Sequence, residues 1–158
     1  MLYLVRHAHA GDKRAWRGPD DARPLSATGW REAAGLVTRL AAHQVSQIVS
    51  SPALRCRQTV QPLAAERELV VQPDALLRVD AAVDEVLPRL LDALGDQAVW
   101  CTHGELIGGL LGRLRRDGAP IGEQAVWPKG SVWLLEPAGG AIRSATYLAP
   151  YRGPGPPG

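Results

Sequence analysis

Short, mostly apolar runs recur along the chain at fairly even intervals. Their length is typical of buried strands and too short for helices. We predict strands at residues 2–5, 45–49, 69–72, 98–101, 133–135 and 142–148. The last two flank the sequence Pro-Ala-Gly-Gly, which favours a turn between them.

Several segments between these runs carry apolar residues at helical spacing. Ser26 or Thr28 can cap the first such helix, whose apolar face is expected at Trp30, Ala33, Ala34, Val37, Leu40 and Ala41. Further helices are predicted at residues 53–67, 83–94 and 105–116. Pro52 suits a first helical turn, whereas Pro62 should kink or interrupt its helix. Residues 11–25, rich in Gly, Pro, Asp and Arg, predict a loop.

Strands that alternate with helices predict a mainly parallel sheet with helices on both faces. We therefore expect an α/β fold, a three-layer α/β/α sandwich with about five to six strands. The 158 residues suffice for one domain, which we place at residues 1–149. Residues 150–158 form a Pro/Gly-rich tail that we predict to be extended or disordered.

Composition and charge exclude several classes of protein. Apolar residues make up 46% and charged residues 22% of the chain, as in ordinary globular domains. The net charge of +2 provides no field that would attract nucleic acid or a membrane surface. No apolar stretch approaches a membrane span, and the N-terminus lacks the pattern of a signal peptide. With only Cys56 and Cys101, a disulfide framework is not expected, which favours a cytoplasmic location.

Polar residues follow three of the predicted strands. Arg6 and His7 come after the first, Ser50 and Ser51 end the second with Arg55 one turn into the next helix, and His103 and Gly104 follow the fourth. Ligand sites in such sheets lie outside the carboxyl ends of the strands. Arginine binds phosphate through paired hydrogen bonds. The sequence therefore predicts a phosphate site at this rim.

These three motifs, in this order, resemble the histidine phosphatase superfamily, which includes the phosphoglycerate mutases. The family's motifs stand here as Arg6-His7-Ala8, as Ser50-Ser51-Pro52 through Arg55 to Thr59, and as His103-Gly104. Arg23-Pro24-Leu25-Ser26 and Gly29 resemble the short branch with the bacterial phosphohistidine phosphatases. The resemblance extends to about Leu148.

A closer likeness is to the phosphatase-like domain that follows a Nudix domain in some actinobacterial proteins. Residues 16–25, the pair Arg55-Cys56 and the later Pro128-Lys129-Gly130 carry this likeness. No Nudix segment is present in these 158 residues.

The resemblance implies a phosphatase in which His7 attacks phosphorus and forms a phosphohistidine that water hydrolyses. Arg6 and Arg55 would hold the phosphoryl oxygens, and His103 would donate to the same oxygens. Gly104 would let the backbone approach closely. Like charges nearby should lower the pKa of His7 and keep it neutral for attack.

The family's general acid has no clear counterpart. Asp80 is the first candidate, Glu105 the second and Asp84 the third. A phosphohistidine leaving group departs readily and needs an acid less, so the missing pattern agrees with that substrate. The substrate is thus expected to be a phosphorylated protein or a small phosphate ester, such as a nucleotide.

Several other polar and charged residues are expected to take no part in catalysis. Four histidines without compact spacing predict no metal site, and no cofactor is expected. Arg57 is expected on a helix face, while His9 and His43 are expected outside the chemistry. A solvated rim is predicted for the charged loop residues Asp12, Lys13, Arg14, Arg17, Asp20 and Asp21. The alternatives are a noncatalytic phosphate-binding module and a phosphoglycerate mutase-type phosphotransferase. The sequence does not indicate the oligomeric state.

Overall fold

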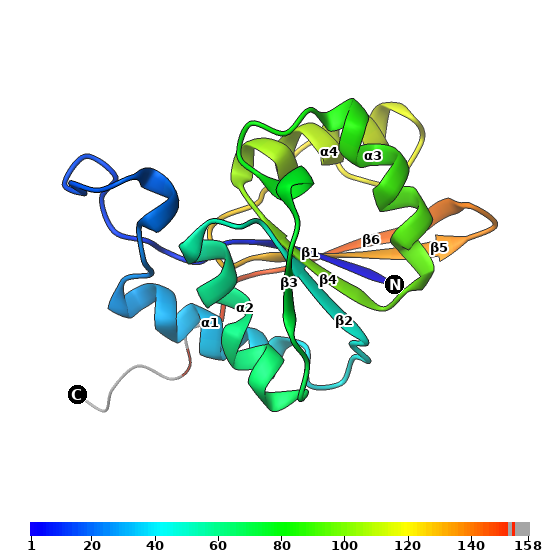
Figure 1. The fold of residues 1–158 in the computed structure, drawn as a ribbon. Coiled ribbons are helices and arrows are strands. Elements are labelled where there is room, and N and C mark those ends of the chain that lie inside the picture. Colours follow the sequence, from blue (N-terminus) through cyan, green and yellow to red (C-terminus); the bar gives the residue numbers. More distant parts are fainter. Residues whose placement is uncertain (152, 154–158) are drawn as a thin grey trace.

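The computed structural model describes residues 1–151 and 153 of the chain. Six strands form one sheet in the order β3-β2-β4-β1-β5-β6 (Figure 1). Their bounds are β1 Leu2–Arg6, β2 Gln47–Ser50, β3 Val71–Pro73, β4 Ala98–Thr102, β5 Val132–Ala138 and β6 Ala141–Leu148. The first four strands are parallel, and β5 and β6 add antiparallel partners at one edge. The predicted mainly parallel sheet is confirmed.

Helices cover both faces of this sheet, which confirms the three-layer α/β/α sandwich (Figure 1). The bounds are α1 Ala27–Arg39, α2 Leu54–Glu66, α3 Val83–Asp92 and α4 Gly104–Arg116. Three 3-10 turns lie at Asp20–Ala22, Ala75–Leu77 and Ala93–Gly95. The first pair of helices packs on one face and the second pair on the other.

The alternation of side chains along β1 explains why its sequence is apolar throughout. Leu2 and Leu4 pack in the core with α3 and α4, whereas Tyr3 and Val5 pack in the core with α1 and α2. A central strand covered on both faces needs apolar residues at every position. This burial fixes the position of the residues at its carboxyl end.

The buried face of α1 differs from the predicted one. Ser26 caps the helix by accepting a hydrogen bond from the Gly29 backbone nitrogen at 3.1 Å. Trp30, expected in the core, is 39% exposed, whereas Glu32 is buried and accepts from the His9 backbone nitrogen at 2.9 Å. A side chain at Gly29 would collide with the His9 carbonyl oxygen. Close packing at Gly29 and the bond to Glu32 therefore set the rotation of α1.

The second helix also departs from the prediction in two ways. Its N-cap is Ala53, so Pro52 lies just before the helix rather than in its first turn. The helix continues through Pro62, and the predicted interruption is wrong. Val60 and Leu63 are fully buried on either side of the proline, so core packing stabilises the helix against the loss of one backbone hydrogen bond.

The last described part of the chain packs against α1. Tyr151 lies against α1, with the Arg39 guanidinium carbon 5.3 Å from its ring centroid. The predicted tail falls mostly on residues 152 and 154–158, outside the described residues. Among the helices that the structure describes, none is both long and apolar enough to cross a membrane.

Candidate active site

His7 is the first residue after β1. Its backbone nitrogen donates to the Thr102 carbonyl oxygen of β4 at 2.9 Å, and the residue is 6% exposed. The Nδ1 atom lies 2.8 Å from the Ala8 carbonyl oxygen. A carbonyl oxygen only accepts, so Nδ1 carries the proton. The free electron pair is therefore on Nε2.

The surroundings of His7 keep the imidazole neutral. Burial lowers the pKa of His7 to about 3, with further lowering by the charges of Arg55, His103 and Arg6, against the opposing hydrogen bond to Ala8. A neutral ring with an unprotonated Nε2 is the nucleophilic form of histidine. The predicted direction of this pKa shift is confirmed, with burial as its largest cause.

Arg55 lies in the first turn of α2 with a side chain only 3% exposed. Its Nη2 atom is 3.3 Å from Nδ1 of His103. The Thr59 hydroxyl fixes this turn, because it donates to the Arg55 carbonyl oxygen at 2.7 Å and accepts from the Ala8 backbone nitrogen at 2.9 Å. Thr59 thus ties the helix of Arg55 to the residue next to His7.

His103 follows β4 and is the N-cap of α4. Its ring centroid is 5.4 Å from that of His7, at an angle of 66°. Arginine only donates, so Nδ1 accepts from Arg55 and Nε2 donates to the Ser51 hydroxyl at 2.9 Å. The Cys56 sulfur lies 3.6 Å from the same Nε2 atom. Both cysteines are buried and free, as the sequence predicted for Cys101.

Arg6 ends β1, and its Nη1 atom donates to the Trp127 carbonyl oxygen at 2.9 Å. A Cβ atom at Gly104 would lie 2.7 Å from the Arg6 guanidinium carbon. Gly104 therefore makes room for the Arg6 side chain, rather than for the backbone approach that we expected. Arg6, Gly104, Glu105 and Trp127 line an open cleft of about 470 Å³.

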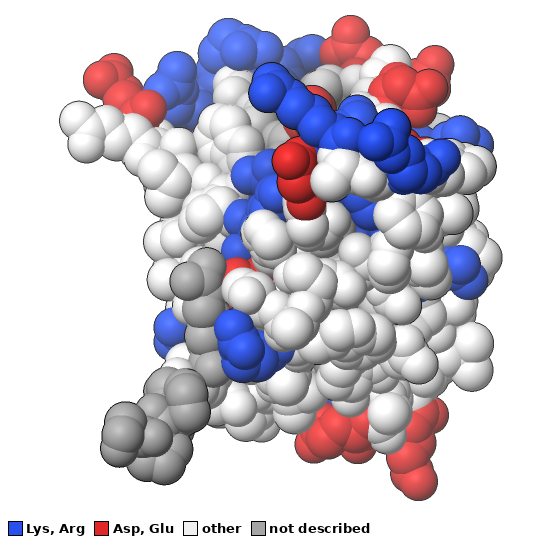
Figure 2. Space-filling view, turned by 90° about the vertical axis from the view of Figure 1, so that its left-hand side faces the viewer, with Lys and Arg blue, Asp and Glu red and all other residues white. Residues whose placement is uncertain are grey.

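We call Arg6, His7, Arg55 and His103 the strand-end pocket, because the carboxyl ends of β1 and β4 and the turn after β2 bring them together. Within the described residues, the Nε atoms of Arg6 and Arg55 are buried without a hydrogen-bond partner. Buried donors of this kind favour an anionic ligand. Figure 2 shows Lys and Arg side chains gathered on the face that this edge of the sheet presents.

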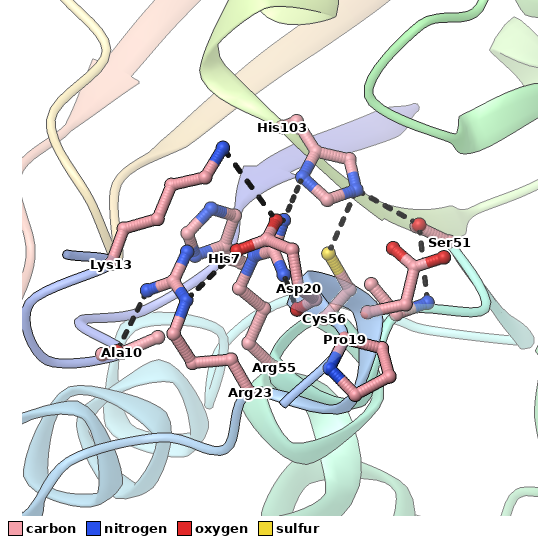
Figure 3. A network of polar contacts seen from close by, with 12 residues as sticks. His7, Ala10, Lys13, Pro19, Asp20, Arg23, Ser51, Arg55, Cys56 and His103 are labelled. Atoms are coloured by element: carbon pink, nitrogen blue, oxygen red, sulfur yellow. Dashed lines mark hydrogen bonds and ion pairs between the residues drawn. The ribbon is translucent and has the colours of Figure 1, made fainter. Parts of the chain in front are cut away.

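Asp20 and Arg23, from the loop at residues 11–25, also reach the strand-end pocket (Figure 3). Asp20 lies in a 3-10 turn, and its carboxylate pairs with Arg55 at 3.0 Å and with Arg23 at 3.1 Å. Arg23 is 7% exposed and donates to the Ala10 carbonyl oxygen at 2.7 Å. The prediction of Asp20 as part of a solvated rim is wrong, because its carboxylate pairs with buried Arg55. The sequence did not indicate this pair, because the two residues are 35 positions apart.

The three candidate acids lie in different places. Asp80 is exposed, and its carboxylate is 3.9 Å from exposed Arg78. Asp84 pairs with Arg113 at 2.8 Å on the surface between α3 and α4. Glu105 lines the cleft beside Arg6, where its charge raises the pKa of the guanidinium against the larger, lowering effect of burial. Only Glu105, the second candidate, is shown next to the strand-end pocket.

Among residues 1–151 and 153, no group of three His, Cys, Asp or Glu side chains is arranged to hold a metal ion. The pocket instead combines a neutral imidazole with the buried guanidinium group of Arg55 and the partly buried one of Arg6. This arrangement can bind a phosphoryl group and attack its phosphorus atom.

The comparisons with known proteins agree with this geometry. The model of the histidine phosphatase superfamily (branch 1) matches residues 2–79. A relative from Mycolicibacterium smegmatis, an 8-oxo-(d)GTP phosphatase, is 34% identical over 154 residues, which cover 94% of this chain and 48% of the relative. The chain therefore spans about half the length of that protein.

Two solved structures illustrate the likeness in fold. A protein of Agrobacterium tumefaciens assigned as phosphohistidine phosphatase SixA is 25% identical, with a TM-score of 0.71 over 94% of this chain and 97% of that one. The protein histidine phosphatase SixA in complex with tungstate is 19% identical, with a TM-score of 0.68 over 94% of each chain.

Proposed function

Since the chain belongs to the histidine phosphatase superfamily, we propose that it hydrolyses phosphate monoesters through a phosphohistidine formed on His7. The observation that carries this proposal is the fixed tautomer of His7. Its Nδ1 proton is held by the Ala8 carbonyl oxygen, and its unprotonated Nε2 belongs to a ring that is neutral at physiological pH.

The reaction proceeds in two steps. The Nε2 atom of His7 attacks phosphorus, the bond to the ester oxygen breaks, and Glu105 supplies a proton to the departing alkoxide. Water then attacks the phosphohistidine, its proton passes to Glu105, and inorganic phosphate leaves. Arg6 and Arg55 bind the nonbridging oxygens and stabilise the charge that spreads over them. His103 accepts from Arg55 through Nδ1 and donates to Ser51 through Nε2, so in this tautomer it holds Arg55 in place rather than donating to the phosphoryl oxygens.

Glu105 replaces Asp80 as the preferred acid. It begins α4 one residue after Gly104 and lines the same cleft as Arg6. Asp80 has 81% of its side chain exposed and pairs with Arg78. The proposal therefore assigns proton transfer to the carboxyl group that lines the cleft beside Arg6.

A nucleotide or similar small ester fits best as the substrate. Its support is the M. smegmatis relative, whose name gives a nucleotide as substrate, and the open cleft beside Trp127. A second candidate is a protein phosphohistidine, which the likeness to the SixA proteins favours.

The test measures turnover of p-nitrophenyl phosphate, a nucleoside monophosphate and a phosphohistidine protein by the purified chain, without added metal. His7→Ala should lose activity by at least about 1000-fold, whereas His9→Asn should stay within about threefold of the wild type. If none of the three substrates is turned over while inorganic phosphate still binds, the proposed hydrolysis is wrong and the alternative of a noncatalytic phosphate-binding module is favoured. The ratio of the rates ranks the substrate classes.

A further inference from the structure

The carboxylate of Asp20 contacts the same nitrogen atom of Arg55 as His103 does (Figure 3). Its Oδ2 atom accepts from Nη2 of Arg55 at 3.0 Å, and its Oδ1 atom accepts from Nε of Arg23 at 3.1 Å. The Lys13 ammonium is 4.0 Å from Oδ2. One carboxylate is thus surrounded by three cations.

The hydrogen bonds of Arg55 occupy both hydrogens of Nη2, the nitrogen atom that lies beside His103. Its Nη2 atom has two hydrogens, and its partners are the Asp20 carboxylate and Nδ1 of His103. Its Nη1 atom donates to the Asp20 backbone carbonyl oxygen at 2.7 Å. A phosphoryl group that binds between Arg55 and the histidines needs the same Nη2 donor. It must therefore compete with the side chain of Asp20.

Residues 12–19, which precede Asp20 in the loop, are held by contacts within the loop itself. The hydrogen bonds from the Arg14 backbone to Asp12 and from Trp16 to the Pro19 carbonyl oxygen stay inside the loop. The Asp20 side chain is 33% exposed, whereas that of Arg55 is 3% exposed. The carboxylate can turn into water, but the guanidinium cannot.

We propose that Asp20 is an internal counterion of the strand-end pocket, which the phosphoryl group of the substrate displaces from Arg55. The proposal rests on the proposed function, because it assumes that phosphate binds at Arg55. A phosphate monoester carries two negative charges and gains more from the cations than the single charge it replaces. A phosphodiester carries one charge and gains no such advantage. Asp20 thus selects monoesters over diesters.

The direct test is the affinity for inorganic phosphate, measured by titration calorimetry at pH 7.5. Asp20→Asn keeps the shape of the side chain and removes its charge. We expect phosphate to bind about tenfold more tightly, which corresponds to about 1.4 kcal/mol. Asp21→Asn is the matched control and should bind phosphate like the wild type, because within residues 1–151 and 153 the ion pair of Asp21 is with exposed Arg78, at 3.4 Å.

Equal or weaker binding by Asp20→Asn would overturn the proposal, and weaker binding would identify Asp20 as a residue that positions Arg55. If the wild type binds phosphate but the variant shows no gain, only the displacement is wrong. If the wild type binds no phosphate, the proposed function is wrong as well.

A measurement on the wild type alone covers the case in which the variant fails to fold. Lys13, Arg14 and Arg17 are exposed trypsin sites in the loop. Saturating phosphate should speed cleavage at these three sites, because it releases Asp20 from Arg55. Slower cleavage in phosphate would show that the loop closes more firmly on the anion, contrary to the proposal.

Discussion

The strand-end pocket and the loop at residues 11–25 use similar residues under different constraints. In the pocket, His7, Arg55 and His103 are buried and hydrogen-bonded to the turns that follow the strands. In the loop, most charged side chains lie in solvent, and Asp20 and Arg23 turn inward. Our proposals account for this contrast: the sheet fixes the reacting groups, whereas the loop governs which anions reach them.

The largest effect on this contrast should come from Arg55→Lys. Lysine offers one point charge in place of a planar fork, so kcat/KM should fall by about 300-fold, as for the loss of a transition-state donor. Arg57→Lys, two residues along the same helix but exposed, should change kcat/KM less than twofold. Equal losses in the two variants would show that burial at the strand ends does not distinguish these arginines.

Glu105→Gln tests whether Glu105, in the cleft beside Arg6, is the general acid. Removal of a general acid should slow hydrolysis of an alkyl phosphate by about 100-fold. It should slow p-nitrophenyl phosphate much less, because nitrophenolate leaves without a proton. Asp80→Asn is the matched control and should leave both rates unchanged. If Asp80→Asn gives the larger loss instead, the assignment of the acid is wrong.

Gly104→Ala sharpens the comparison by moving one pocket residue slightly. The added methyl group would meet the Arg6 guanidinium at 2.7 Å, so Arg6 must shift. We expect kcat/KM to fall about tenfold through misplaced substrate. Gly112→Ala lies in the same helix, where a methyl group would meet only an Arg116 nitrogen at 3.6 Å. If the loss comes from the displaced Arg6, kcat/KM should fall in Gly104→Ala and stay near the wild-type value in Gly112→Ala. Equal values for the two variants would attribute the change to helix propensity instead.

The last effect concerns stability against pH and leaves activity aside. The pKa of His7 is about 3 in the folded protein and near 6.5 when unfolded. Below pH 6.5 the unfolded state therefore binds a proton that the folded state does not, and stability falls as the pH falls. From pH 7.5 to 5 this contribution should be about 2 kcal/mol. In His7→Asn, the free energy of unfolding measured with urea should change by about 2 kcal/mol less between pH 7.5 and 5 than in the wild type. An equal change in both proteins would contradict the burial of a neutral His7.

The sheet could be predicted because apolar runs mark its strands. The positions of Arg6, His7 and His103 follow from the rule that parallel strands end at the same edge. The motif from Ser50 to Thr59 also has a physical meaning that the structure supplies. Ser51 holds His103, and Thr59 joins the turn of Arg55 to Ala8.

Long-range contacts set the features that could not be predicted. The predicted face of α1 included both Ala33 and Ala34, but only Ala33 is buried, and the bond from the His9 backbone to Glu32 fixes this rotation. Asp20 and Arg23 look like ordinary loop charges, because nothing near them in the sequence indicates Arg55. The sequence around Asp80, the first candidate acid, gave no indication that 81% of its side chain is exposed.

The most direct measurement is to trap the phosphorylated enzyme. The chain is mixed with p-nitrophenyl phosphate, quenched in alkali within milliseconds to seconds, digested and analysed by mass spectrometry. Our account predicts one acid-labile phosphoryl group on the peptide with His7, formed with the burst of nitrophenol and absent from His7→Ala. Turnover without this adduct, or with the phosphoryl group on another residue, would contradict the assignment of His7 as the nucleophile.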